Sequence, residues 1–278
     1  MPLSSVNSDY NNDLHNWDEI ERQVFNIARA GFTHTQWIHD WEGEYLYSPS
    51  EMFQVRDLLR SCGLKAHTIH ASEGGRRTVL RDGRKYFRNA ERFKDIRKDY
   101  TSANEYTRMA GVDLLRNRID LCSHIGASAM VLHMQLPWKW FAEAPQNREE
   151  YFRQVCKSFD ELQPYAKAAG VRVALENLIA TPWQEQEACF DRMFDRYDAD
   201  FLGYTFDSGH AVLQCGHDPC YFLRKYHSRL YATHLQENNG IDPALNTDPV
   251  ETLAHDSHWV PMDSRGGGLI DWNEVAHW

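Results

Sequence analysis

The chain has 278 residues, of which 42% are hydrophobic and 25% charged, proportions typical of a globular protein. Its formal net charge of −10 argues against non-specific binding of nucleic acid, which requires clustered Lys and Arg. No stretch approaches the ~18 apolar residues of a membrane span, and the first residues lack the basic and apolar regions of a signal peptide, so we expect a cytoplasmic protein. The six cysteines form no C-x-x-C pair, and we expect them to be reduced.

The first part of the chain alternates predicted strands and helices. Short runs rich in β-branched and aromatic residues predict strands near 3–10, 32–41 and 64–72. Amphipathic stretches that end on glycine predict helices over 17–31 and 50–63. Ser50 is the expected N-terminal cap of the second helix.

Residues 72–100 interrupt this alternation. The segment is broken by glycines and is strongly basic within an acidic protein. It is either a solvated loop or a lid over the functional face of the fold. A basic lid would suit an anionic substrate such as a sugar phosphate.

The alternation then resumes and continues through the chain. A strand at 127–135 places His133 at its exit. Gly126 ends the helix before that strand, and Pro164 is expected to kink the helix after it. Amphipathic patterns predict helices over 102–125, 147–170, 185–197 and 219–229, and the start of another near 269.

Three apolar runs in the second half each end in side chains that bind metals. The runs VRVALEN, LGYTFDSGH and LYATHLQEN end respectively near Glu176, near Asp207 with His210, and near His234. Such short aliphatic runs are typical of buried parallel strands. In a parallel barrel the carboxyl ends of all strands lie on one face, and that face carries the chemistry.

The pattern as a whole predicts an α/β protein with a (β/α)8 TIM barrel in a single domain over 1–278. Seven strand candidates can be counted, and no eighth. A closed barrel requires an eighth strand to pair the first with the seventh. We therefore expect the barrel to be truncated before its eighth βα unit, and closed pairing around the sheet would overturn this expectation.

Glu176, Asp207 and His234 form a mixed set of oxygen and nitrogen ligands. Such a set suits Mn²⁺, Co²⁺, Zn²⁺ or Fe²⁺, whereas Mg²⁺ prefers oxygen alone. Three protein ligands leave coordination positions open for a substrate. Each residue alone is equally compatible with a structural hydrogen bond, but their recurrence at successive strand ends favours a shared site. Further candidates around them are His70, His133, His210, Asp256 and His258.

Three tryptophans are candidate contacts for a sugar: Trp37 in the second strand, and Trp138 and Trp183 just after the fourth and fifth strands. Indole rings offer flat apolar faces that stack on sugar C–H surfaces and also on flipped bases. The alternative is that these rings pack loops against the rim of the barrel.

The segments ALEN, FDSGHA, THLQEN and DSHWVPMDSRGGGLIDW resemble those of the xylose isomerase-like TIM-barrel superfamily, over residues 15–278. That superfamily contains sugar and sugar-phosphate isomerases and epimerases, inosose isomerases and dehydratases, and endonucleases of the endonuclease IV type. The resemblance implies that Glu176, Asp207 and His234 bind one catalytic divalent ion, Mn²⁺, Co²⁺ or Zn²⁺. The usual fourth ligand, a Glu at the exit of an eighth strand, has no counterpart in this sequence.

The resemblance favours a metal-dependent sugar or sugar-phosphate isomerase or epimerase that acts by proton transfer through a metal-bound enediolate. Glu176 is the candidate base, and His210 is expected to contact a hydroxyl and move protons. The expected partner is a small sugar or sugar phosphate, and neither a membrane nor nucleic acid is expected. Whether the chain forms a homo-oligomer stays open. The expected substrate contacts are Trp37, His70, His133, Trp138, Trp183, His258 and Arg265.

Three alternatives stay open. A related branch eliminates or rearranges oxidised glycosides at the same site, and an inactive fragment would bind a sugar without turnover. An apurinic-site endonuclease would hold three metal ions, so the number of ions per chain separates it from the sugar enzymes. The histidine and carboxylate positions of that endonuclease branch correspond, by resemblance, to His70, His133, Glu176, Asp207, His210, His234, Asp256 and His258.

Overall fold

The computed structural model describes most of the chain, in two compact units. The described residues are 5–10, 16–41, 44–71, 78–81, 84–87, 97–179, 181–215, 218–240, 259–261 and 268–278. The predicted site residues Asp256, His258 and Arg265 lie outside them. The first unit contains residues 1–75, 94–132 and 145–173, and the second contains 76–93, 133–144 and 174–278. The expectation of a single domain over the whole chain stays a prediction.

Four parallel strands form the framework of the first unit. They follow one another in chain order, each paired with the next: β1 (Ser5–Asn7), β2 (His34–Trp37), β3 (Lys65–His70) and β6 (Ala129–Leu132). All four were predicted from the sequence, including the short first strand. The last two strands are almost entirely buried, as parallel strands covered by helices on one face and filled on the other must be.

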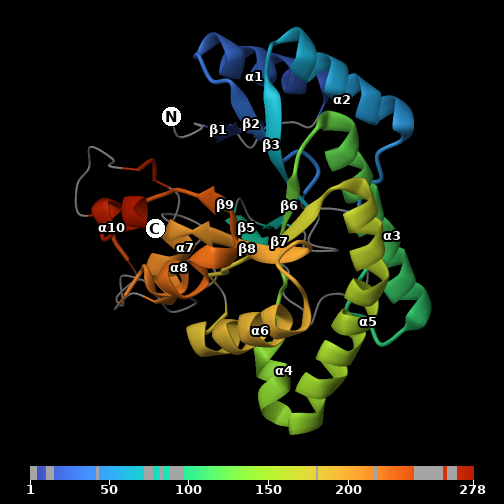
Figure 1. Cartoon of the computed structure of the whole chain (residues 1–278), viewed down its shortest axis with the longest axis vertical. Coiled ribbons are helices and arrows are strands. Elements are labelled where there is room, and N and C mark those ends of the chain that lie inside the picture. Colours follow the sequence, from blue (N-terminus) through green and yellow to red (C-terminus); the bar gives the residue numbers. More distant parts are fainter. Residues whose placement is uncertain are drawn as a thin grey trace. The chain divides into compact units, whose positions relative to one another are not determined.

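The helices of the first unit begin and end where the sequence carries caps. They are α1 (Trp17–Arg29), α2 (Pro49–Ser61), α3 (Glu105–Ile125) and α5 (Pro145–Ala169), and α3 and α5 pack against each other (Figure 1). Gly126 ends α3 with a left-handed φ of 81°, and Pro164 lies inside α5 as predicted.

The expected cap of α2 was wrong by two residues. Ser48, and not Ser50, is the N-cap, and its hydroxyl accepts from the backbone of Glu51. The Glu51 carboxylate accepts in return from the backbone of Ser48, which completes a capping box. Pro49 occupies the first helical position, where its fixed φ and missing N–H are favourable. The helix therefore starts one residue before Ser50.

The second unit contains two parallel strands and an antiparallel pair. β8 (Leu202–Asp207) and β9 (Leu230–His234) pair in parallel, and β7 (Arg172–Glu176) enters this unit with its last three residues. β4 (Thr78–Arg81) and β5 (Arg84–Phe87) pair antiparallel. They belong to the basic segment 72–100, for which the sequence predicted only a loop or a lid; the rest of that segment up to residue 96 lies outside the described residues.

An aromatic core holds the helices of the second unit against β8. The Phe190 ring of α6 (Trp183–Arg196) lies 5.5 Å from Tyr204 of β8, and 5.8 Å and 5.5 Å from Phe222 and Tyr226 of α8 (Tyr221–Tyr226). These edge-to-face pairs are favourable beyond the apolar area that they bury. The other helices are α4 (Trp138–Glu143), α7 (Ser208–Gln214), the 3₁₀ turn η2 (His227–Arg229) and α10 (Trp272–His277).

A buried carboxylate ties the last described segment to the end of β9. Glu237 is buried, and its two oxygens accept from the backbone N–H groups of Leu269 and Ile270 and from the indole of Trp272, at 3.0, 3.2 and 2.7 Å. A Cβ at Gly268 would lie 2.3 Å from the Glu237 side chain. Glycine is therefore needed at that position.

The strands follow the order β1-β2-β3-β6-β7-β8-β9 in a seven-stranded sheet, which is the order of successive βα units. β1 and β9 are its edge strands, and the described residues add no eighth strand to it. The seven predicted strands are thus confirmed.

Within the described residues, no helix is both long and apolar enough to cross a membrane.

Candidate metal centre

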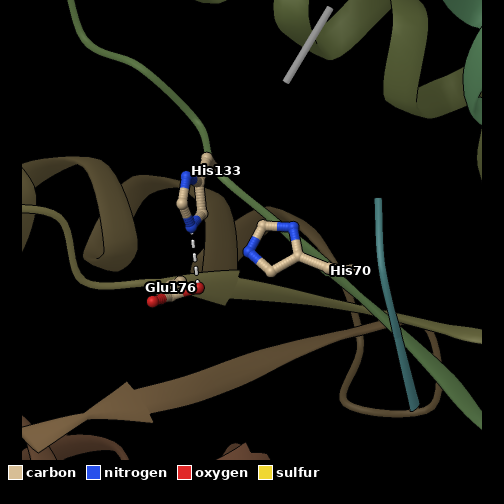
Figure 2. A group of neighbouring side chains, drawn as sticks. All are labelled: His70, His133 and Glu176. Carbon is tan, nitrogen blue, oxygen red and sulfur yellow. Dashed lines mark hydrogen bonds and ion pairs between the residues drawn. The ribbon is translucent and has the colours of Figure 1, made fainter. Parts of the chain in front are cut away.

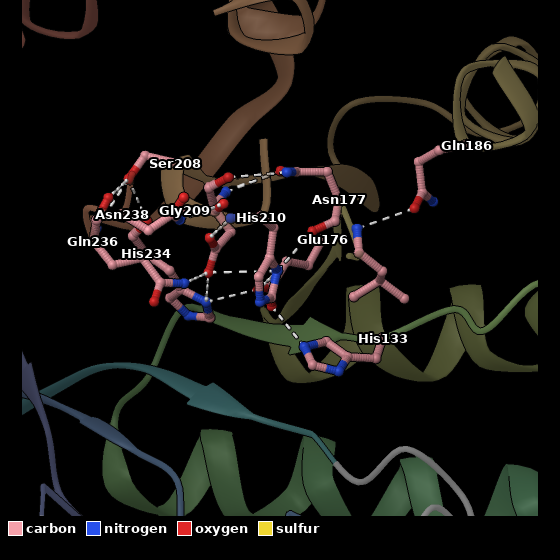
Figure 3. Close-up of polar contacts among 12 residues, drawn as sticks. His133, Glu176, Asn177, Gln186, Ser208, Gly209, His210, His234, Gln236 and Asn238 are labelled. Atoms are coloured by element: carbon pink, nitrogen blue, oxygen red, sulfur yellow. Dashed lines mark hydrogen bonds and ion pairs between the residues drawn. The ribbon is translucent and has the colours of Figure 1, made fainter. Parts of the chain in front are cut away.

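Three successive strands of the sheet end in the predicted ligand residues. Glu176 is the last residue of β7, Asp207 the last of β8 and His234 the last of β9. Asp207 and His234 are register partners across the β8–β9 pair, so their side chains leave neighbouring backbones at the same level. The strand ends alone therefore bring two of the three groups together. Figure 3 shows His234 with the third group, Glu176.

The three side chains converge on one point. His234 Nδ1 lies 3.0 Å from Glu176 Oε1 and 3.7 Å from Asp207 Oδ2. One ligand atom from each of the three residues lies within 4.8 Å of the others, close enough for a single ion to contact all three. Both carboxylates are 1% exposed. Two carboxylate oxygens and one imidazole nitrogen, removed from water, fit a divalent transition metal or zinc.

Two more imidazoles contact the same buried carboxylate. His133 follows β6 and its Nε2 lies 2.9 Å from Glu176 Oε2 (Figure 2). His210, in α7, has its Nδ1 3.2 Å from Glu176 Oε1 and 2.9 Å from the backbone oxygen of Asn177. Because a carbonyl oxygen only accepts, His210 carries a proton on Nδ1. Three histidines therefore surround Glu176.

The charged groups of this cluster shift one another's pKa values. Burial would raise the pKa of Glu176, but the neighbouring His234 and His133 hold it well below its usual value. Burial would lower the pKa of His234, but the Glu176 and Asp207 carboxylates raise it to about 10. The pKa of His210 is raised for the same reason, against its own burial. The cluster thus attracts positive charge, which a proton or a metal ion supplies.

A buried asparagine that sequence reasoning missed holds the ends of β7 and β8 together. The Asn177 side-chain oxygen accepts from the Asp207 backbone N–H and from the Tyr204 hydroxyl, both at 2.9 Å. Its amide donates to the Asp207 backbone oxygen at 2.9 Å. The signal was the Asn of ALEN, a polar residue directly after a buried strand. Its side chain thus sets the position of Asp207, a predicted ligand.

The helix α7 was also missed, and it orients Asp207. Asp207 is the N-cap of α7, and its Oδ1 accepts from the backbone N–H of His210 at 2.7 Å. This leaves Oδ2 to face His234 and to accept from the Gln236 amide. An Asp followed by Ser and Gly directly after a strand is a recognisable cap signal.

Two further predicted contacts lie in the first unit. His70 ends β3 in the first unit, where its Nδ1 lies 3.1 Å from the Ala71 oxygen and its ring 4.6 Å from that of Trp41. Trp37 is 1% exposed and donates to the Tyr47 hydroxyl at 3.1 Å. Its role as a substrate contact stays a prediction.

The two remaining tryptophans lie at helix starts in the second unit. Trp138 begins α4 and is partly buried, with the Lys139 ammonium 5.5 Å from its ring. Trp183 begins α6 and meets Tyr221 edge to face at 5.4 Å. Their role as sugar contacts stays a prediction.

The family of the chain follows from comparison with known proteins. Residues 24–278 match the model of the xylose isomerase-like TIM barrel family, and the chain belongs to that family. This confirms the resemblance and the fold class that the sequence predicted.

Similar proteins differ in how much of this chain they cover. The uncharacterized protein y4fM of Sinorhizobium fredii is 30% identical over 264 residues, which are 94% of this chain and 77% of that protein. Inosose dehydratase 2 of Bacillus cereus is 26% identical over 139 residues, 49% of this chain and 45% of that enzyme. The solved structure of a D-tagatose 3-epimerase-like protein has a TM-score of 0.58 at 20% identity and covers 86% of this chain and 77% of that one. This last likeness concerns the fold.

Proposed function

We propose that the protein is a sugar or sugar-phosphate isomerase or epimerase that depends on one divalent metal ion. Glu176, Asp207 and His234 would hold the ion, which their donor set suits as Mn²⁺, Co²⁺ or Zn²⁺. The observation that carries the proposal is the convergence of these three side chains, two of them buried carboxylates, from three consecutive strand ends. Sugar epimerases among the structural neighbours support the choice of substrate class.

The chemistry proposed is the movement of a proton on a carbon next to a carbonyl. A divalent ion supplies the polarisation of the carbonyl and hydroxyl oxygens that makes such a proton acidic. Glu176 is the base: its Oε1 faces His234, whereas Oε2 contacts His133. Because His133 holds Oε2 in a fixed direction, that oxygen is positioned to take the proton.

His210 and the outer residues have supporting roles in this proposal. The Nδ1–H of His210 is fixed on the Asn177 carbonyl, which sets the orientation of the ring beside Glu176. His210 would bind a substrate hydroxyl and move its proton. Trp138 and Trp183 stay proposed sugar contacts, and so do His258 and Arg265, which lie outside the described residues.

A second candidate is the elimination of water from a keto-sugar. The observation that favours it is the similarity to inosose dehydratase 2 over half of the chain. The first step is the same, because the proton next to the carbonyl must leave before a hydroxyl does. The two reactions differ in the product, since elimination loses one water and epimerisation keeps the mass of the substrate.

Solvent-deuterium uptake into a ketose tests the proposal. In the presence of Mn²⁺ we expect wild-type protein to incorporate one deuteron at carbon, and Glu176→Gln to lose this exchange by at least 10³-fold, because the only proposed base is gone. Glu187→Gln is the matched control, since this helix carboxylate pairs with Lys225 on the surface. Exchange at an unchanged rate in Glu176→Gln would remove this residue from the mechanism.

A further inference from the structure

A buried glutamine beside the candidate metal ligands has a hydrogen-bonded side-chain nitrogen, whereas its side-chain oxygen has no donor among the described residues. Gln236 follows His234 by two residues and is 8% exposed, whereas Leu235 between them is exposed. Its side-chain Nε2 donates to Asp207 Oδ2. The backbone of Gln236 is fixed as well. Its N–H donates to the Ser208 hydroxyl at 2.9 Å, and that hydroxyl donates to the backbone oxygen of Gln236 at 2.6 Å.

The direction of the amide follows from chemistry. An ionised carboxylate only accepts hydrogen bonds, so the NH₂ group of Gln236 must face Asp207. A flipped amide would place its oxygen against a carboxylate oxygen, and the two would repel each other. Gln236 Oε1 therefore points away from Asp207, and within the described part of the chain this buried oxygen has no hydrogen-bond donor.

A buried acceptor without a donor is unfavourable unless a ligand or water supplies one. Asp207 Oδ2, to which the same amide is bonded, is also the oxygen that faces His234. Oε1 and Nε2 of Gln236 are bonded to the same amide carbon, and Nε2 contacts Asp207, a proposed metal ligand. The unpaired oxygen therefore lies close to the proposed metal site. A sugar bound at that ion carries several hydroxyl groups, which are donors of the kind that Oε1 lacks.

We propose that Gln236 binds the substrate of this site: Oε1 accepts a hydrogen bond from one hydroxyl of the sugar, while Nε2 holds Asp207 in place. The identity of the ligand as a sugar rests on the proposed function. The consequence is specificity, since a site with a fixed buried acceptor rejects an analogue that lacks the matching hydroxyl. Gln236 thus selects among sugars that the metal ion alone would bind equally.

The test compares Gln236→Met with a matched glutamine. Gln214, at the end of α7, also donates through Nε2 to a carbonyl, that of Thr181 at 3.0 Å, and its Oε1 is likewise buried without a donor among the described residues. Its amide is bonded to Thr181 and not to Asp207, so Gln214→Met controls for loss of a buried amide. The probes are D-tagatose, D-allulose and their monodeoxy analogues, titrated calorimetrically into Mn²⁺-loaded protein.

We expect wild type to bind one deoxy analogue at least tenfold more weakly than its parent ketose. Gln236→Met should bind the parent about tenfold more weakly and bind that analogue as wild type does, the signature of a coupled pair. Gln236→Lys, which can donate to Asp207 but cannot accept, should lose the same discrimination. Gln214→Met should keep it.

The outcomes separate this inference from the proposed function. If wild type binds no ketose, both fail. If ketoses bind but Gln236→Met still discriminates fully between the parent ketose and its deoxy analogue, or binds all of them equally more weakly, the inference alone fails. In that case water is the hydrogen-bond donor to Oε1. If Gln236→Met lowers only the Mn²⁺ affinity, the residue is structural and its contact with a sugar is excluded.

Discussion

The most informative single perturbation is Glu176→Gln in the metal-free protein, with His234 as the reporter. The pKa of His234 is raised to about 10 from an ordinary 6.5, which corresponds to about 5 kcal/mol in favour of its protonated form. Its Nδ1 lies 3.0 Å from Glu176 Oε1 and 3.7 Å from Asp207 Oδ2. Glu176 is the nearer and more effective of the two carboxylates.

Replacing Glu176 by glutamine keeps the shape and removes the charge. An opposite charge at this distance moves a pKa by roughly 1–3 units, so we expect the pKa of His234 to fall from about 10 to about 8. The assay is an NMR titration of the His234 ring in protein stripped of metal by a chelator. Glu187→Gln, a helix carboxylate on the surface of the same unit, should leave the titration unchanged.

The same pKa makes a prediction about stability. The pKa of His234 is higher in the folded chain than in the unfolded chain, so its ion pair stabilises the metal-free fold fully below pH 6.5. That stabilisation is lost as the pH rises from 6.5 to about 10. In Glu176→Gln the loss should end near pH 8 and be smaller. A wild-type His234 that titrates near 6.5, or a variant that still titrates near 10, would refute the reasoning.

Three further predictions follow from neighbouring contacts. Metal binding at pH 7 should release a proton from His234, so calorimetric enthalpies should depend on the buffer and metal affinity should rise with pH; no buffer dependence would contradict this. Asn177→Ala leaves the Asp207 backbone N–H and oxygen without their side-chain partner and should destabilise the fold by about 3 kcal/mol in urea unfolding, whereas a loss near zero would exclude its structural role. Glu237→Ala should abolish the hydrogen-exchange protection of amides 269 and 270, which Glu237→Gln should partly keep; unchanged protection in Glu237→Ala would count against the anchor.

The sequence was sufficient where one local pattern decides the structure. Apolar runs of strand length separated by helical stretches predicted seven strands. Residue identity at the strand ends predicted which side chains meet, because parallel strands place their carboxyl ends on one face. The convergence of Glu176, Asp207 and His234 therefore required no knowledge of packing.

The errors occurred where two patterns compete or where partners are distant in the chain. Ser48 and Ser50 are both plausible caps, and only the proline between them and the later Glu51 decide in favour of Ser48. The amides of Asn177 and Gln236 contact residues about thirty positions away, and their roles depend on the register of neighbouring strands.

The central claim is that Glu176, Asp207 and His234 share one ion. Anomalous scattering at the zinc edge, from crystals grown with Zn²⁺, measures this directly. We predict one peak per chain, at about 2.0–2.2 Å from a carboxylate oxygen of Glu176, a carboxylate oxygen of Asp207 and a ring nitrogen of His234. A peak elsewhere, or no peak at these residues, would contradict the account, and three peaks per chain would assign the site to the phosphodiesterase chemistry instead.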